Sequence, residues 1–275
     1  MSVRCEICPH SCVIGEGRTG FCGARGNRGG AVVCTNYGRL TAMALDPIEK
    51  KPLYRFMPGS RILSVGSYGC NLRCPFCQNC GISMADEGSA DTAYMPPEQL
   101  ADKALALVPQ GNIGVAFTYN EPLIGFEYVA DCARLVRACG LKNVLVTNGY
   151  VCERPLLDIL PLIDAMNIDL KGFTEEFYRR LSGDLDTVKT TIALAAGRCH
   201  VEVTTLVIPG ENDGAEEMEA LAAWLAGVGA DIPLHLSRFF PRYKYAGKTP
   251  TPKETLYRLR DVAQRHLKYV YLGNI

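Results

Sequence analysis

The sequence predicts an α/β fold, a partial (β/α)6 TIM-like barrel with a small cysteine-rich appendage at its N-terminus. Three observations lead to this fold class. From residue 61 onward, short β-branched apolar runs alternate with helical segments, which is the pattern of a parallel sheet. Six such units are too few for a closed eight-stranded barrel. Residues 1–36, by contrast, combine many cysteines and glycines with little apolar content.

Residues 1–36 are expected to form a metal-binding segment. Their four closely spaced cysteines are Cys5, Cys8, Cys12 and Cys22. A short segment that cannot build an apolar core usually needs a metal to fold. The thiolates could hold zinc or a second iron–sulfur cluster, and the ligand spacing does not decide between them. His10 and Cys34 are possible substitutes for one cysteine, and reduced thiols without a metal are the remaining alternative.

Residues 37–60 are expected to form a connector that is ordered but irregular, because its prolines forbid long helices. It should pack across the following domain or line the mouth of the site. Lys51 and Tyr54 are candidate neighbours of the site, although simple packing roles suit them better.

Residues 61–275 are expected to form the barrel domain. The predicted strands are Arg61–Gly66, Gly114–Thr118, Asn143–Thr147, Ala165–Leu170, Val201–Val207 and Pro233–Arg238, with Tyr269–Leu272 as a final addition. The predicted helices are one that opens at Pro96-Pro97-Glu98, then Phe126–Cys139, Phe173–Leu181, Leu185–Ala196, Ala215–Ala226, and one that starts with a capping-box-like Thr251-Pro252-Lys253-Glu254.

A loop with three cysteines follows the first predicted strand. Cys70, Cys74 and Cys77 stand at C-x3-C-x2-C spacing. Iron–sulfur clusters take cysteine thiolates as ligands, so these residues can hold three corners of a [4Fe–4S] cube and leave one iron free to bind a small molecule. Phe76 can shield the cluster and stack on a flat ligand. The alternative is a closed zinc site with Cys80 as fourth ligand.

Polar residues also follow the other predicted strands. In parallel α/β folds the carboxyl ends of the strands meet on one side, where the chemistry gathers. These positions hold Thr118-Tyr119-Asn120-Glu121, Thr147-Asn148, Asp169-Leu170-Lys171, Thr204-Thr205 and His235. We therefore expect one polar mouth that also contains the cysteine loop.

The composition excludes several classes of protein. Lys+Arg and Asp+Glu balance at 29 each, so no basic field argues for nucleic acid. No stretch approaches the roughly twenty apolar residues of a membrane span, and the N-terminus lacks the apolar region of a signal peptide. The 13 cysteines are therefore expected to be metal ligands and reduced thiols in a reducing cytoplasm.

The cysteine loop resembles the signature of radical SAM enzymes. In that family S-adenosylmethionine (SAM) binds the open iron, and reduction releases a 5′-deoxyadenosyl radical. By this resemblance Glu121 accepts from the SAM ammonium or anchors its loop, beside backbone groups of Tyr119 and Asn120. Asn148 and Asp169 would bind the ribose. The remaining expected roles are charge neutralisation or pairing with Asp169 by Lys171, and flanking of the adenine by His235 with backbone near Leu206.

Residues 61 to about 241 resemble the activating enzymes of pyruvate formate-lyase, although the usual Gly-Gly-Glu reads Tyr119-Asn120-Glu121 here. Over its full length the chain is similar to the radical SAM member of the AmmeMemoRadiSam system. The segments that carry this resemblance are Cys5-x2-Cys8-Pro9-x2-Cys12, Asp46–Tyr54, Cys74-Pro75-Phe76-Cys77-Gln78-Asn79, Thr118–Pro122 and Tyr271–Asn274.

The resemblance implies an enzyme that abstracts hydrogen from a substrate, expected to be a protein side chain on a Memo-like partner. A flavodoxin or ferredoxin-type protein would supply the electron. No side chain is expected to act as general acid or base, because cofactors carry such chemistry. The alternatives are an activase of a glycyl-radical enzyme, a non-catalytic iron–sulfur electron-transfer or binding protein, and a structural zinc protein.

Overall fold

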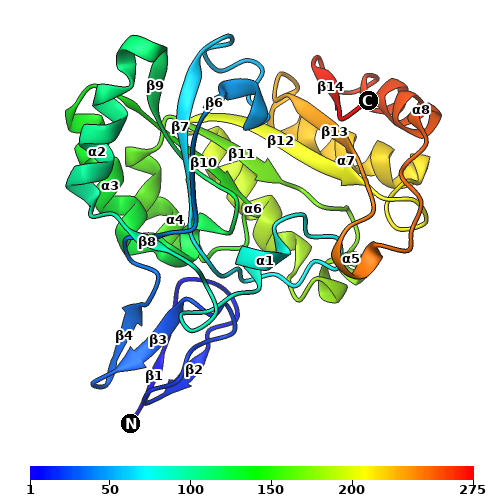
Figure 1. The fold of residues 1–275 in the computed structure, drawn as a ribbon. Coiled ribbons are helices and arrows are strands. Elements are labelled where there is room, and N and C mark those ends of the chain that lie inside the picture. The colour runs from blue at the N-terminus through cyan, green and yellow to red at the C-terminus, as the bar shows by residue number, and fades with distance from the viewer.

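A curved eight-stranded sheet forms the frame of the molecule in a computed structural model that describes residues 1–275 (Figure 1). Its strand order is β14-β13-β12-β11-β10-β9-β7-β6. The strands are β6 (Ala42–Pro47), β7 (Arg61–Gly66), β9 (Asn112–Phe117), β10 (Lys142–Thr147), β11 (Ala165–Asp169), β12 (His200–Val207), β13 (Leu234–Arg238) and β14 (Val270–Gly273). All neighbours are parallel except β6 and β7.

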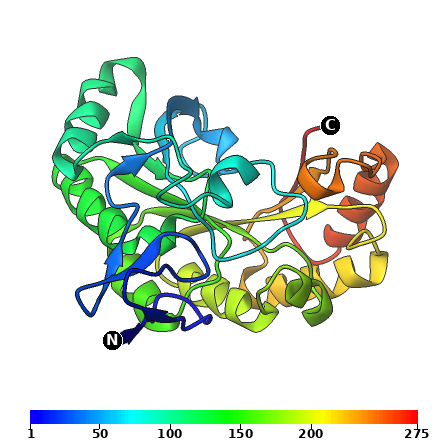
Figure 2. The ribbon, with the colours of Figure 1, turned by 60° about the horizontal axis from the view of Figure 1, so that its bottom comes forward.

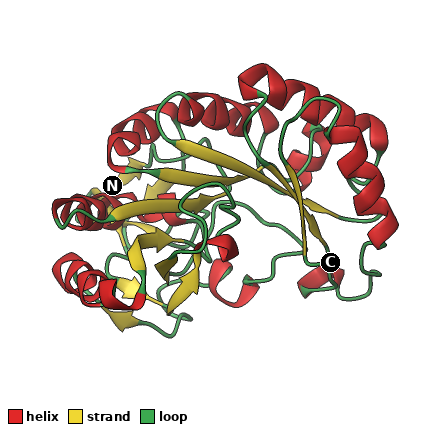
Figure 3. Ribbon diagram, turned by 90° about the horizontal axis from the view of Figure 1, so that it is seen from above, coloured by secondary structure: helices red, strands yellow, loops and turns green.

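The sheet does not close on itself, because β14 pairs only with β13 and β6 pairs only with β7. Figure 3 shows the helices along the outside of the curve. The principal helices are α2 (Pro97–Ala106), α3 (Phe126–Ala138), α4 (Glu153–Ile159), α5 (Glu175–Arg180), α6 (Leu185–Ala196), α7 (Ala215–Gly229) and α8 (Lys253–Ala263). The predicted incomplete barrel is thus confirmed. Parallel strands buried between two layers read as continuous apolar runs, which is why they were recognisable.

Three local predictions were wrong. The connector is not irregular throughout, because β6 lies within it and pairs with β7 from Ala42↔Gly66 to Pro47↔Arg61. No capping box begins α8, since the Thr251 hydroxyl donates to the Val207 carbonyl at 2.6 Å. Helix α4 was missed because it is short and has Pro155 inside its first turn. None of the helices is both long and apolar enough for a membrane crossing.

The N-terminal residues form two small hairpins rather than a bare loop. Strand β1 (Ser2–Arg4) pairs with β2 (Val13–Gly15), and β3 (Arg25–Arg28) pairs with β4 (Ala31–Cys34). A third small sheet joins β5 (Arg39–Leu40) to β8 (Ala93–Tyr94). Figures 1 and 2 both place the hairpins against the end of the barrel that carries the loop after β7. The buried Arg25 fixes them there by donating two hydrogen bonds to Glu127 on α3, one of them at 2.8 Å.

Candidate functional site

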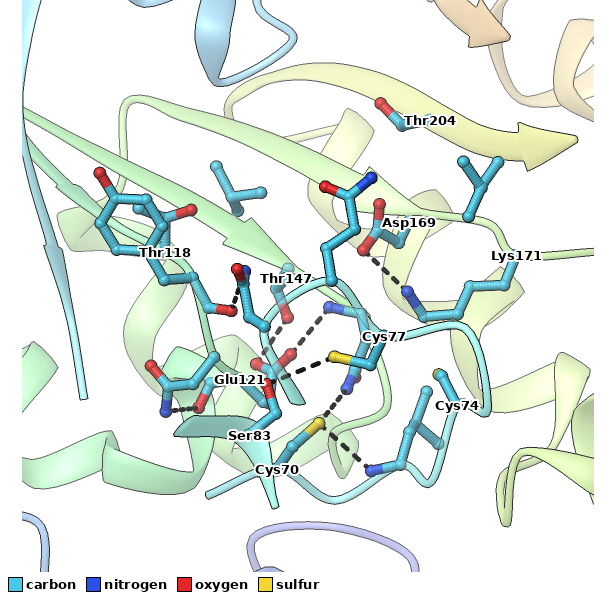
Figure 4. A pocket seen from close by; sticks show the side chains of 18 of the residues that line it. Cys70, Cys74, Cys77, Ser83, Thr118, Glu121, Thr147, Asp169, Lys171 and Thr204 are labelled. Atoms are coloured by element: carbon cyan, nitrogen blue, oxygen red, sulfur yellow. Dashed lines mark hydrogen bonds and ion pairs between the residues drawn. The ribbon is translucent and has the colours of Figure 1, made fainter. Parts of the chain in front are cut away.

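A cavity of about 340 Å³ opens at the carboxyl ends of the strands. The cysteine loop forms one wall, and residues that end or follow β9 to β13 form the other (Figure 4). The predicted site residues that line it are Cys70, Cys74, Phe76, Cys77, Tyr119, Asn120, Glu121, Asn148, Asp169, Lys171 and Leu206. Polar groups from distant parts of the sequence therefore meet in one place, as parallel topology requires.

The three thiols lie in a setting that suits an iron–sulfur cluster. Cys70 Sγ accepts hydrogen bonds from Leu72 N–H at 3.4 Å and from Asn148 Nδ2 at 3.6 Å. Burial raises the pKa of Cys74 to about 11 and raises that of Cys70 further, with the Glu121 charge adding to it. These thiols therefore become thiolates only when a metal compensates the charge. Cys80, the fourth ligand of the alternative zinc site, begins the short helix α1 (Cys80–Ser83) and does not line the cavity.

Glu121 anchors the strand ends beside the cysteine loop. Its carboxylate accepts from Leu123 N–H at 3.0 Å, from the Thr147 hydroxyl at 2.7 Å and from Asn148 N–H at 2.8 Å. Burial raises its pKa to about 7, although these three donors favour the ionised form. Of the two predicted roles, anchoring the loop is the one whose contacts are present.

Asn148 and Asn120 hold the cysteine loop from two sides. Asn148 Nδ2 donates to Asn71 Oδ1 at 2.9 Å, and its Oδ1 accepts from Tyr150 N–H at 2.8 Å. Asn120 Nδ2 donates to the carbonyls of the residues before Cys70, Tyr68 at 3.2 Å and Gly69 at 3.1 Å. Both ends of the Asn148 amide are thus engaged, which gives it a positioning role, and its ribose contact stays a prediction.

Asp169 and Lys171 form an ion pair at 2.9 Å on the cavity wall. Burial opposes the charge on Lys171, but the neighbouring Asp169 carboxylate outweighs it and raises the lysine pKa. Thr204 pairs in register with Asp169 on the next strand and lines the same wall. The wall therefore offers one carboxylate, one ammonium and one hydroxyl to a bound molecule.

A second charged group faces the cavity from the connector. Lys50 and Lys51 line it, and Asp46 accepts from Lys51 Nζ at 3.0 Å and from the Tyr119 hydroxyl at 3.0 Å. Burial alone would raise the Asp46 pKa, but Lys51 and the tyrosine lower it to about 2. Tyr119 holds a backbone φ of +73°, the left-handed region that glycine adopts most readily.

Some lining residues were missed from the sequence. They are Lys50, Gln78, Asn79, Ser83, Met84, Val146, Ser237 and Asn274. Thr204 was predicted at the polar mouth and does line the cavity, on the same side of β12 as Leu206 because side chains alternate along a strand. Lys51, a candidate neighbour of the site, also lines it, whereas Lys50 was missed because the strand before it was predicted as irregular chain.

His235 does not line the cavity, contrary to its predicted place beside an adenine. It lies one layer deeper in the barrel, where its Nε2 is 2.6 Å from Glu202 Oε2. Tyr54 also packs there, with its ring centroid 4.8 Å from that of His235. Burial would raise the Glu202 pKa, but both histidines and two backbone N–H groups lower it to about 2. This cluster joins the connector to the barrel interior.

The four N-terminal cysteines gather around one small cavity of about 10 Å³. His10 also lines it, but its Nε2 lies 2.8 Å from the Asn71 carbonyl oxygen. Cys34 lies outside it and donates its thiol to Asn36 Oδ1 at 3.0 Å. No three of these or other His, Cys, Asp and Glu side chains are arranged to hold a metal ion in the structure, so the N-terminal metal site and its ligands stay a prediction.

The sequence matches the model of the Radical SAM superfamily over residues 64–225. It is 40% identical over 277 residues to an uncharacterized protein of Methanocaldococcus jannaschii, covering 99% of this chain and 81% of that protein. It is 24% identical over 224 residues to pyruvate formate-lyase 1-activating enzyme of Escherichia coli, covering 76% of this chain and 90% of that enzyme.

Two solved structures share the fold. A domain of pyruvate-formate lyase-activating enzyme from Bacteroides vulgatus superposes with a TM-score of 0.52 at 15% identity, over 58% of this chain and 99% of that one. Streptococcus suis SuiB bound to S-adenosylmethionine superposes with a TM-score of 0.58 at 14% identity, over 77% of this chain and 51% of that one.

Proposed function

The chain belongs to the radical SAM superfamily, and from this premise we propose that Cys70, Cys74 and Cys77 hold its [4Fe–4S] cluster and that the adjoining cavity binds SAM. Radical SAM enzymes use these two cofactors, so the chain is an enzyme of this class. The observation that carries the residue assignment is that the three thiols share one cavity with the polar strand ends.

When bound and reduced, the cluster supplies the electron that splits SAM into methionine and a 5′-deoxyadenosyl radical, which takes a hydrogen atom from the substrate. The residues of the chain position and shield this chemistry. Asn120 and Asn148 fix the loop, Phe76 covers it, and Leu72 N–H donates to the Cys70 sulfur. Such hydrogen bonds tune the reduction potential of a cluster.

We propose that SAM lies between the cysteine loop and the wall formed by β11 and β12. The ammonium and carboxylate of SAM would lie next to the cysteine loop. The backbone groups of Tyr119 and Asn120 lie beside that loop and could accept from the ammonium. Asp169 is the only carboxylate on the β11–β12 wall of the cavity, and it suits the ribose hydroxyls. Lys171 stays paired to Asp169, and the backbone near Leu206 is left for the adenine.

The proposed substrate is a protein side chain, with a Memo-like protein as the partner and a flavodoxin or ferredoxin-type protein as the reductant. The full-length resemblance of the sequence supports the partner. An activase of a glycyl-radical enzyme is the second candidate, because an Escherichia coli relative is named as pyruvate formate-lyase 1-activating enzyme. Mass spectrometry of candidate partners before and after turnover would reveal a modified side chain, whereas an activase would instead give a glycyl radical in electron paramagnetic resonance.

The test of the core proposal is anaerobic reconstitution with iron and sulfide, followed by SAM and dithionite. We expect 5′-deoxyadenosine from the wild type and none from Cys74→Ala, which should lose the cluster and keep its fold. Cys139→Ala is the matched control, because Cys139 is exposed and is not one of the residues that line the cavity. An intact cluster without 5′-deoxyadenosine would favour a non-catalytic electron carrier, and cleavage by Cys74→Ala would refute the ligand assignment.

A further inference from the structure

The cavity has a second charged end, which the connector forms. Strand β6 runs antiparallel to β7, so Pro47 at its end lies beside Arg61 at the start of β7, whereas the cysteine loop follows the end of β7. Figure 1 shows the chain after β6 at the end of the sheet opposite the N-terminal hairpins. Lys50 and Lys51 line the cavity, so they reach it from the side away from the cysteines. SAM bound beside the cysteine loop leaves this end free for a substrate.

This connector end of the cavity carries more positive than negative charge. A single carboxylate, that of Asp46, lies 3.0 Å from Lys51 Nζ and 3.3 Å from Lys50 Nζ. The side chain of Lys51 is 4% exposed and is therefore committed to Asp46, whereas that of Lys50 is 67% exposed. The neighbouring Glu49 is engaged elsewhere, because its carboxylate accepts from Gly59 N–H at 2.7 Å. The ammonium of Lys50 is thus left to meet a further negative charge.

Buried contacts fix the chain that carries the two lysines. The carboxylate of Glu202 is fully buried and accepts from Tyr54 N–H at 3.0 Å and from Arg55 N–H at 2.7 Å. Asn167, also buried, donates to the Pro52 carbonyl at 2.8 Å. Losing such a bond would leave a buried polar group unpaired, which is costly. The backbone of the connector therefore holds the lysine pair at the cavity in a fixed position.

Uncharged polar residues line the same cavity from the opposite edge of the sheet. Asn274 directly follows β14, and Ser237 lies on the neighbouring strand β13. Asn274 is exposed and has a φ of +61°, a left-handed conformation that asparagine adopts more readily than most residues. Its amide offers N–H donors and no charge. One ammonium and one amide therefore border the side of the cavity that strand pairing does not close.

We propose that Lys50, assisted by Asn274, binds a carboxylate of the substrate, and that the enzyme acts on an acidic protein segment. This inference rests on the function proposed above and adds the class of substrate. One unbalanced ammonium matches the single charge of a carboxylate, and charge-assisted hydrogen bonds are stronger than neutral ones. An Asp or Glu side chain held at the connector end fixes the segment there, and it thereby selects which neighbouring side chain faces SAM.

A matched pair of peptides tests the carboxylate site without radical chemistry. The probes are an end-blocked Gly-Glu-Gly-Glu-Gly peptide and its Gln counterpart, titrated into the chain loaded with cluster and SAM and followed by ligand-observed NMR. We expect the wild type to prefer the Glu peptide by about fivefold, as one exposed ion pair allows, and Lys50→Gln to lose this preference. Lys50→Arg should retain it. Lys103→Gln is the matched control, because Lys103 is exposed on α2 and does not line the cavity.

Two further measurements keep the test independent of the folding of one variant. Added salt should weaken binding of the Glu peptide to the wild type and leave the Gln peptide unaffected. Asn274→Gly removes the amide without straining the backbone and should reduce the preference by about twofold. Equal binding of both peptides by the wild type, or an unchanged preference in Lys50→Gln, would overturn the proposal. Glutarate binding at Lys50 without peptide binding would refute the protein substrate.

SAM cleavage is measured separately on the wild type with dithionite. Absence of 5′-deoxyadenosine together with an intact peptide preference would refute the proposed radical function and leave the carboxylate site standing. The reverse result, cleavage without any preference for the Glu peptide, would refute the carboxylate site alone.

Discussion

One buried ion pair contributes to the docking of the N-terminal hairpins, which allows a quantitative prediction. The side chain of Arg25 is 6% exposed and that of Glu127 on α3 is 43% exposed. Breaking a buried pair costs about 3–5 kcal/mol, and the partial hydration of the remaining glutamate places Arg25→Ala at about 2–3 kcal/mol. A control lies three residues further along, because Arg28 pairs with Glu87 at 60% and 31% exposure. Arg28→Ala should cost less than about 1 kcal/mol.

Native-state hydrogen exchange measures this difference locally. If the hairpins open as a unit, the amides of β3 and β4 should exchange about 30- to 150-fold faster in Arg25→Ala, since each 1.4 kcal/mol is about a factor of ten. In Arg28→Ala the same amides should change by no more than about fivefold. Equal exchange in the two variants would show that the Arg25–Glu127 pair does not anchor the segment.

Two further predictions concern the main site. Because burial raises the Glu121 pKa to about 7, ionising it in the folded state costs free energy, so its contribution to stability is complete below about pH 4.5 and lost as the pH rises through 7. Urea unfolding should therefore show the wild type losing up to about 3 kcal/mol relative to Glu121→Gln between pH 4.5 and 8, whereas parallel curves would contradict the burial argument. Gly66→Ala places a Cβ 2.7 Å from the Tyr119 ring and should cost about 1–3 kcal/mol in the same assay. Gly81→Ala, with open space around it, should stay near wild type, and equal stability of the two variants would mean that the loop yields freely.

The fold could be predicted where the hydrophobic pattern had only one interpretation. The strand at Arg61–Gly66 and the helix at Leu185–Ala196 match the structure to the residue. Strand β6 was missed because its alternation is weak and it ends in Pro47, so its pairing with β7 is a tertiary effect. The Thr251 hydroxyl likewise satisfies a β12 carbonyl instead of capping its own helix, which no local pattern reveals.

The candidate site could be predicted as a set but not in its internal contacts. Glu121, Asp169 and Lys171 lie at or after the carboxyl ends of predicted parallel strands, and this common position correctly placed them in one cavity. The same reasoning failed for His235, which lies two residues before Ser237 on β13. Ser237 lines the cavity, whereas His235 lies in the layer below it. It also could not show that the Asn148 amide donates to Asn71, since that hydrogen bond depends on how the cysteine loop folds back.

The unpaired edges of the sheet have a mechanical consequence. Lys50 and Lys51 follow the strand at one edge, Asn274 follows the strand at the other, and all three residues border the cavity. No ladder of hydrogen bonds joins those edges, so they can spread apart without breaking any strand pairing. Strand pairing would fix the width of the mouth of a closed barrel. In this open sheet the side of the cavity between β6 and β14 is not closed by strand pairing.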